Sequence, residues 1–138
     1  MSEKSESCCP PPFGKGGNGK YDLAVIGAGS AGFSAAITAA ELGANVALIG
    51  HGTIGGTCVN VGCIPSKNLI RATESLHRAK AANRFLGIRG DAEITDWRAV
   101  MAQKDEIVTD LRQGKYIDVL PSYNNIAYIE GPVGLRLV

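Results

Sequence analysis

The sequence lacks a marked excess of charge of either sign. It contains 14 Lys and Arg residues against 13 Asp and Glu residues, which gives a formal net charge of +1. A charge of this size is too small to drive association with a polyphosphate or with an anionic membrane surface. We therefore expect no nucleic-acid partner and no membrane partner.

Strongly apolar runs and targeting segments are also missing. The uncharged stretch from Leu23 to Ala40 reaches the lower length limit of a transmembrane helix, but its glycines and hydroxyl residues make it only weakly apolar. The first twenty residues contain no apolar segment of the secretory type. We therefore expect a cytoplasmic protein, whose cysteines stay reduced unless they belong to a redox mechanism.

Glycine is the residue type in excess. The chain has 138 residues, enough for one compact domain, and 9 of its 18 glycines fall between Gly27 and Gly62. Residues 1–20 are rich in Ser, Glu, Pro and Gly, and this composition predicts a flexible tail. We expect residues 21–138 to form the folded part.

The hydrophobic pattern predicts an α/β fold with a parallel sheet. A buried strand over residues 21–26 precedes a glycine-rich turn, a helix over 33–42 that Gly43 ends, and a second strand over 46–49. This strand, helix, strand order requires parallel pairing. Further along the chain we predict a loop over 50–62, a helix that has Pro65 in its first turn and continues to about Ala82, a helix from the N-cap Asp96 to Gly114, and a strand over 126–129.

The turn Gly27-x-Gly29-x-x-Gly32 is typical of dinucleotide binding. The first glycine permits the tight turn, the second lets a pyrophosphate approach the backbone, and the third lets helix and strand pack closely. A glycine-rich turn without a ligand is the alternative. The acidic residue that usually holds the ribose about 20 residues later is replaced by Gly50. We expect this to weaken nucleotide binding, and Gly50→Glu to tighten it.

Cys58 and Cys63 form the second candidate site. Two cysteines five residues apart at a helix start can close a small disulfide, and the helix dipole there lowers the pKa of a thiol. A zinc site needs two more ligands with suitable spacing, which His51 and His77 do not provide. Two inert buried thiols are the remaining alternative.

Together, GAGSAG and the later GGTCVNVGCIPSK resemble the FAD-dependent pyridine nucleotide–disulfide oxidoreductases. Within that family, the continuation NLIRATE and the segment DLRQGKY most resemble the mercuric reductases. The resemblance covers about residues 21–130. It implies a Rossmann-like FAD-binding domain, FAD as cofactor, NADPH as hydride source, and Hg(II) as substrate.

The resemblance also implies a role for each matching residue. Cys58 would be the exchange thiol that faces the substrate, and Cys63 the thiolate beside the flavin. Lys67 would tune the charge near the flavin, although an ordinary solvated helix lysine is the alternative. The residues that would contact FAD are Gly27, Gly29, Ser30, Gly32, Gly52, Gly56, Thr57 and Lys67.

Members of this family are several times longer and form homodimers, so the resemblance implies a truncated, N-terminal portion of the FAD-binding domain. We expect these 138 residues alone to be inactive. The alternatives are a segment of a dihydrolipoamide dehydrogenase or glutathione reductase, and a non-catalytic thiol or metal-binding remnant. The adjacent Cys8 and Cys9 could also capture a soft metal such as Hg(II), or be simply exposed thiols.

Overall fold

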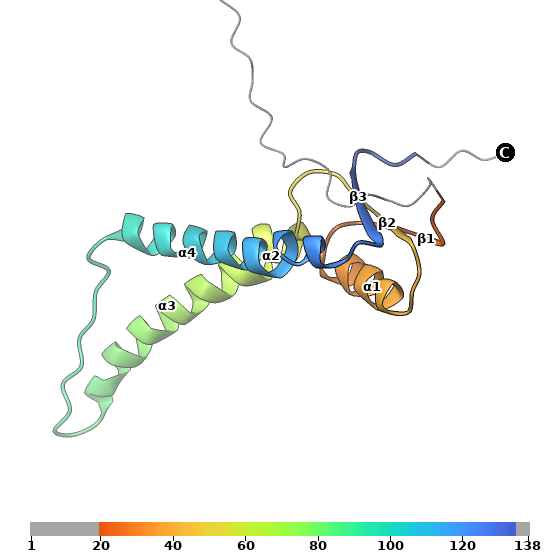
Figure 1. The fold of residues 1–138 in the computed structure, drawn as a ribbon. Coiled ribbons are helices and arrows are strands. Elements are labelled where there is room, and N and C mark those ends of the chain that lie inside the picture. Colours follow the sequence, from red (N-terminus) through yellow and green to blue (C-terminus); the bar gives the residue numbers. More distant parts are fainter. Residues whose placement is uncertain (1–19, 135–138) are drawn as a thin grey trace, which may run out of the picture. The chain divides into compact units, whose positions relative to one another are not determined.

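The computed structural model describes residues 20–134, and these residues divide into two compact units. The first unit comprises residues 20–52 and 118–134, and the second comprises residues 53–117. A parallel sheet characterises the first unit, whereas the second is helical (Figure 1). This division was not predicted, because residues 21–138 were expected to form one folded part.

The first unit is built on a three-stranded parallel sheet. Its elements are β1 (Leu23–Ile26), α1 (Ser30–Glu41), β2 (Val46–Gly50) and β3 (Ile126–Glu130). The strand order is β1-β2-β3, and both strand pairs are parallel. This confirms the predicted α/β class and the crossover from β1 through α1 to β2.

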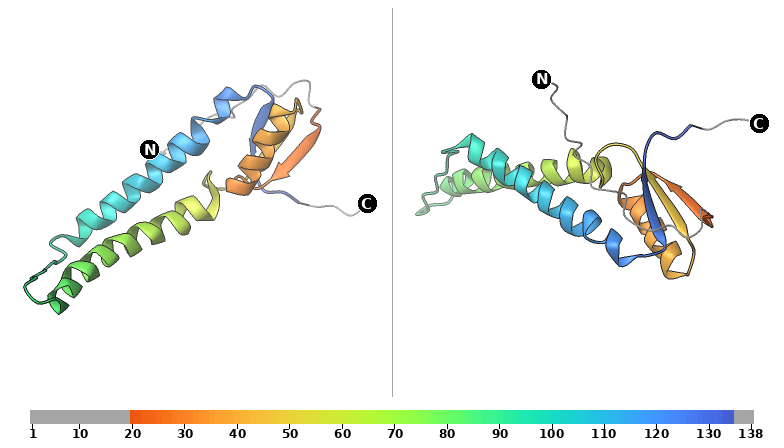
Figure 2. Two further views of the ribbon diagram at one scale, coloured as in Figure 1. Left: turned by 90° about the horizontal axis from the view of Figure 1, so that it is seen from below. Right: turned by 45° about the horizontal axis from the view of Figure 1, so that its top comes forward.

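The core of this unit lies where α1 packs on the sheet (Figure 2). The central strand β2 is buried over most of its length, as expected for a parallel strand with a neighbour on each side. Helix α1 buries Phe33, Ala36 and Ala40, which share one helix face. The helix begins at Ser30, within the glycine pattern, which is three residues earlier than predicted.

The carboxyl end of α1 is tied to the start of β3. Gly43 has a φ of +90°, which confirms it as the residue that ends the helix. The side-chain amide of Asn125 donates hydrogen bonds to the carbonyls of Ala40 and Ala44, each at 2.8 Å. The Ala40 carbonyl also accepts a hydrogen bond of 3.0 Å from the N–H of Gly43, so Asn125 binds the last turn of α1 and Ala44, in the connection to β2, together.

The second unit contains α2 (Gly56–Asn60), α3 (Cys63–Ala81) and α4 (Trp97–Arg112). Helices α3 and α4 run side by side in opposite directions (Figure 2). Asp96 is the N-cap of α4, as predicted: its carboxylate accepts hydrogen bonds from the backbone N–H groups of Arg98 and Ala99 at 2.8 and 3.3 Å. None of the helices in the described part of the chain is long and apolar enough to cross a membrane.

Two predicted boundaries in this unit were wrong. The predicted loop over 50–62 contains the short helix α2, which the glycines concealed. Helix α3 begins at Cys63, so Pro65 lies in its first turn, as predicted. Helix α4 ends at Arg112, and a π-helical turn over Gln113–Ile117 takes up Gly114.

We predict that Gly32→Ala destabilises the first unit. A Cβ atom at position 32 would lie 1.8 Å from the carbonyl oxygen of Gly27, so the turn and α1 would have to separate. We expect the free energy of unfolding in urea to fall by about 1–3 kcal/mol or more. Gly114→Ala is the control, because its Cβ would meet nothing within 4 Å. Equal stability of Gly32→Ala and the wild-type chain would contradict the packing.

Candidate functional site

The glycine turn joins β1 to α1 with the geometry of an anion site. Gly27 has a φ of +111°, and its N–H donates to the carbonyl of Ile49 at 2.8 Å. Gly29 is the N-cap of α1 and offers no capping side chain, and the first turn of α1 contains no acidic residue. The backbone N–H groups in the first turn of α1 and the positive end of the helix dipole are therefore suited to binding a phosphate.

The close approach of helix and strand at Gly32 is the part of the glycine pattern that the structure explains most directly. Only a residue without a Cβ fits there, because of the Gly27 carbonyl. The turn therefore fits the pyrophosphate of a dinucleotide such as FAD. Ser30, which was predicted to contact the cofactor, is the first residue of α1.

Gly50 ends β2, where the usual pattern places a ribose-binding acid. It is buried, and a Cβ at this position would lie 2.7 Å from the Tyr128 hydroxyl and 2.8 Å from the Ala28 Cβ. The expectation that Gly50→Glu alone tightens nucleotide binding therefore loses its basis. A glutamate has no room there unless its neighbours move.

In the second unit, the structure brings Cys58 and Cys63 together. Cys58 lies within α2 and is half-buried, and Cys63 is the first residue of α3 and is exposed. Both are free thiols, and their side chains lie close enough to interact. The connection between α2 and α3 therefore brings the two thiols close enough to form a disulfide, as the spacing of the cysteines predicted.

The pKa of the Cys58 thiol is raised above its ordinary value. The main cause is the hydrogen bond with the Cys63 side chain, followed by desolvation and by the charge of Cys63. The backbone of Cys63 and the positive charge of Lys67 act in the opposite direction. For Cys58, the expected lowering by a helix dipole was wrong, because it is inside a five-residue helix beside a second sulfur.

Asn60 holds the cysteine segment in shape, and the sequence prediction missed it. Its side-chain amide donates to the carbonyls of Ile54 and Gly56 at 3.0 and 2.9 Å. Its carbonyl accepts a hydrogen bond of 3.2 Å from Arg112 of α4. The available signal was a lone amide residue between two cysteines in a glycine-rich segment.

The predicted site residues divide between the two units. Those of the first unit are Gly27, Gly29, Ser30, Gly32 and Gly52, and those of the second are Gly56, Thr57, Cys58, Cys63 and Lys67. Cys8 and Cys9 lie outside the described residues. Within residues 20–134, no three His, Cys, Asp or Glu side chains gather as a metal site would require.

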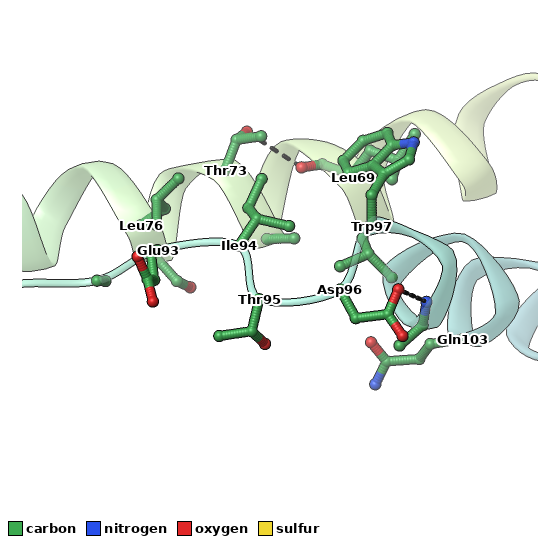
Figure 3. A pocket seen from close by; sticks show the side chains of 14 residues that line it. Leu69, Thr73, Leu76, Glu93, Ile94, Thr95, Asp96, Trp97 and Gln103 are labelled. Atoms are coloured by element: carbon green, nitrogen blue, oxygen red, sulfur yellow. Dashed lines mark hydrogen bonds between the residues drawn. The ribbon is translucent and has the colours of Figure 1, made fainter.

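A cavity of about 580 Å³ lies between α3, α4 and the segment that joins them (Figure 3). Leu69, Leu76, Ile94 and Trp97 give it a mainly apolar lining. The polar group of Asp96 is already used to cap α4. No predicted site residue lines this cavity.

The family model of the pyridine nucleotide–disulphide oxidoreductases matches residues 21–130. The chain belongs to this family. The match covers the glycine turn, both cysteines and all strands and helices described above. The predicted fold class and family are therefore confirmed.

Individual members of the family are similar to this chain over most of its length. A mercuric reductase of Lysinibacillus sphaericus is 50% identical over 104 residues, which are 75% of this chain and 19% of that protein. A dihydrolipoyl dehydrogenase of Bacillus subtilis is 40% identical over 110 residues, 79% of this chain and 24% of that protein. The chain thus spans about a fifth to a quarter of the length of these relatives.

A solved structure has a similar fold. It is the Cu(II) complex of an HOCl-induced flavoprotein disulfide reductase from Escherichia coli, with 36% identity and a TM-score of 0.59. The similarity covers 81% of this chain and 22% of the other. The Rossmann-like arrangement of this oxidoreductase chain therefore agrees with that of a flavoprotein.

We predict that removing the charge of Lys67 raises the pKa of Cys58 further. The ammonium group favours the Cys58 thiolate, so Lys67→Met should make the thiol harder to ionise, whereas Cys63→Ala should bring its pKa down. Both shifts are measured by following the ultraviolet absorbance of the thiolate during a pH titration of the reduced chain. To isolate these thiols, both variants carry Cys8→Ser and Cys9→Ser. An unchanged pKa of Cys58 in Cys63→Ala would contradict the interaction between the two thiols.

Proposed function

We propose that this chain is part of an FAD-dependent enzyme that reduces Hg(II) with NADPH, and that Cys58 and Cys63 are its redox-active pair. The observation that carries this proposal is that α2 and the start of α3 bring the two free thiols close enough to interact. The glycine turn, with the geometry of a phosphate site, supports the nucleotide part. The 50% identity to a mercuric reductase supports Hg(II) as substrate.

Each residue has a defined part in this proposal. The turn residues Gly27, Gly29, Ser30 and Gly32 would hold the pyrophosphate of FAD at the start of α1. Gly52, Gly56, Thr57 and Lys67 would make further contacts to the cofactor. When bound, FAD supplies two-electron transfer between the nicotinamide and the cysteine pair. Cys63 would face the flavin, and Cys58 would exchange with the substrate.

A dithiol suits mercury because Hg(II) is a soft cation that prefers thiolate ligands. Two electrons and two protons convert a Cys58–Cys63 disulfide into two thiols, and each thiol releases its proton when its sulfur binds Hg(II). In the overall reaction, the two electrons of the NADPH hydride pass to Hg(II). The products are elemental mercury, NADP⁺ and one proton, so charge and electrons balance.

The proposal also places the chain within a larger protein. We take the chain from residue 21 onward as an N-terminal portion of an FAD-binding domain that belongs to a homodimeric, cytoplasmic enzyme; the tail predicted over residues 1–20 lies, apart from Lys20, outside the described residues. The share of 17–25% that the chain covers of its relatives supports this placement. On this basis we expect no turnover from the 138 residues alone.

Reduction of an organic disulfide is the second candidate. It is favoured by the similarity to dihydrolipoyl dehydrogenase of Bacillus subtilis and by the 41% identity to a leghemoglobin reductase of Glycine max. The same cysteine pair would then exchange with a substrate disulfide instead of binding a metal. A non-catalytic thiol protein is the third candidate.

We predict that the reduced chain binds one Hg(II) through Cys58 and Cys63 together. The test uses a Cys8→Ser/Cys9→Ser background, so that only these two cysteines remain, and measures Hg(II) binding in competition with a small dithiol. Because one sulfur ligand of two is lost, Cys58→Ser or Cys63→Ser should weaken binding by roughly a hundredfold or more. His77→Ala on α3 is the control and should bind as tightly as the background.

Two results would contradict the proposal. Equal Hg(II) affinity in the background and in either single serine variant would show that the pair does not act as a dithiol. Rapid exchange of the reduced chain with lipoamide or glutathione disulfide, combined with weak Hg(II) binding, would instead favour the organic disulfide as substrate.

A further inference from the structure

Tyr128 lies at the position where the nucleotide-binding pattern lacks its acidic residue. We infer that the Tyr128 hydroxyl takes over the contact with the ribose hydroxyls of the nucleotide's adenosine half, which Gly50 cannot make. The inference rests on the proposed function, because it takes the glycine turn to bind the pyrophosphate of FAD. It names a nucleotide-binding residue on β3 that neither the glycine pattern nor the cysteine pattern indicates.

The first argument is the packing around Gly50. A Cβ atom at this position would lie 2.7 Å from the Tyr128 hydroxyl oxygen and 3.1 Å from a ring carbon of the same tyrosine. The tyrosine therefore occupies the space into which a side chain at position 50 would project. Glycine at position 50 and tyrosine at position 128 are complementary, and neither would suit the usual acidic residue.

The second argument is the position of that hydroxyl relative to the turn. The same Cβ point lies 2.8 Å from the Cβ of Ala28, which belongs to the turn between Gly27 and Gly29. The Tyr128 hydroxyl and the glycine turn thus both lie beside Gly50, at the carboxyl end of β2. Ligands of open parallel sheets bind outside the carboxyl ends of the strands.

The third argument is the strand register. Tyr128 pairs with Leu48 and Glu130 with Gly50 in the parallel β2–β3 ladder. Residues two apart share a face of a strand, so Tyr128 lies on the same face of the sheet as Gly50. It is two residues before Glu130, the last residue of β3, which pairs with Gly50. Its half-buried side chain is long enough to place the hydroxyl beside Gly50, at the carboxyl end of β2.

The chemistry of the phenol fits a pair of ribose hydroxyls. A tyrosine hydroxyl both donates and accepts a hydrogen bond, whereas a carboxylate only accepts. The contact would be neutral and therefore weaker than the charge-assisted bond that a glutamate makes. We therefore expect a nucleotide affinity below that of a site with the acidic residue.

Glu130 is the competing source of a polar group. It is exposed and pairs in register with Gly50, so a carboxylate does lie at this edge of the sheet. Like Tyr128, it belongs to β3, which is separated from β1 and its turn by β2, and it is exposed, whereas Tyr128 is half-buried. The Tyr128 hydroxyl, by contrast, reaches across to the point shared by Gly50 and Ala28, so we assign the contact to Tyr128.

The first test compares Tyr128→Phe with the wild-type chain. The probes are FAD, ADP and FMN, and affinities come from NMR titration of the isotope-labelled 138-residue chain, which also detects weak binding. Loss of one neutral hydrogen bond should weaken FAD and ADP binding by roughly two- to tenfold. FMN lacks the adenosine half, so its binding should not change. Tyr123→Phe is the matched control, because its hydroxyl bonds to Glu41 at 3.1 Å instead.

The second test exchanges the two groups. Gly50→Glu alone should not tighten ADP binding, because Tyr128 blocks the side chain. Gly50→Glu combined with Tyr128→Ala and Ala28→Gly removes both neighbours of the new side chain, and this triple variant should bind ADP at least as tightly as the wild-type chain. Circular dichroism spectra must show that each variant is folded.

The outcomes separate this inference from the proposed function. If the wild-type chain binds FAD and ADP but Tyr128→Phe binds them equally well, the inference is wrong and the FAD site stands. Weakening by Glu130→Gln, without weakening by Tyr128→Phe, would assign the contact to Glu130 and overturn the inference. If the wild-type chain binds neither nucleotide, both the inference and the proposed FAD site fail.

Discussion

The parallel pairing of three strands is the constraint on which the first unit depends. Parallel strands end at the same edge of a sheet, so the register that aligns β1, β2 and β3 brings the glycine turn, Gly50 and Glu130 to one edge. Helix α1 begins at this edge and directs its N-terminal N–H groups there. The anion-binding geometry thus follows from the strand order, and Gly32 permits the close packing that holds it.

The second unit solves a different problem, that of bringing two sulfur atoms together and keeping them accessible. A short helix and a long helix meet at Gly62, whose Cβ would lie 2.9 Å from the Thr57 carbonyl oxygen. This tight connection places Cys58 and Cys63 in contact, while Asn60 ties the segment to its own carbonyls and to Arg112. The cost is a Cys58 thiol that ionises less readily than an ordinary one.

The sequence predicted those parts of the structure that depend on local pattern. The βαβ order, the stop at Gly43 and the N-cap Asp96 all follow from residues a few positions apart, and the structure confirms them. Short-range chemistry also predicted the closeness of Cys58 and Cys63. The same local logic concealed α2, because glycine is a poor helix former and five residues give little periodicity.

Features that depend on distant residues were not predictable. Arg112 lies 52 positions from the Asn60 that it contacts, and nothing in either segment indicates the other. The missing acid at position 50 was visible in the sequence, but the reason for it was not. Tyr128 meets Gly50 only through the β2–β3 pairing, so a single sequence could not show that the position is filled.

The central claim is that Cys58 and Cys63 form one two-electron dithiol. The most direct measurement is to oxidise the chain mildly, digest it with trypsin and determine by mass spectrometry the mass of the peptide from Tyr21 to Lys67. This peptide contains both Cys58 and Cys63. The account predicts that this peptide loses the mass of two hydrogen atoms, through an internal disulfide that a reductant reverses. A Cys58 or Cys63 that links instead to Cys8, to Cys9 or to a second chain would contradict it.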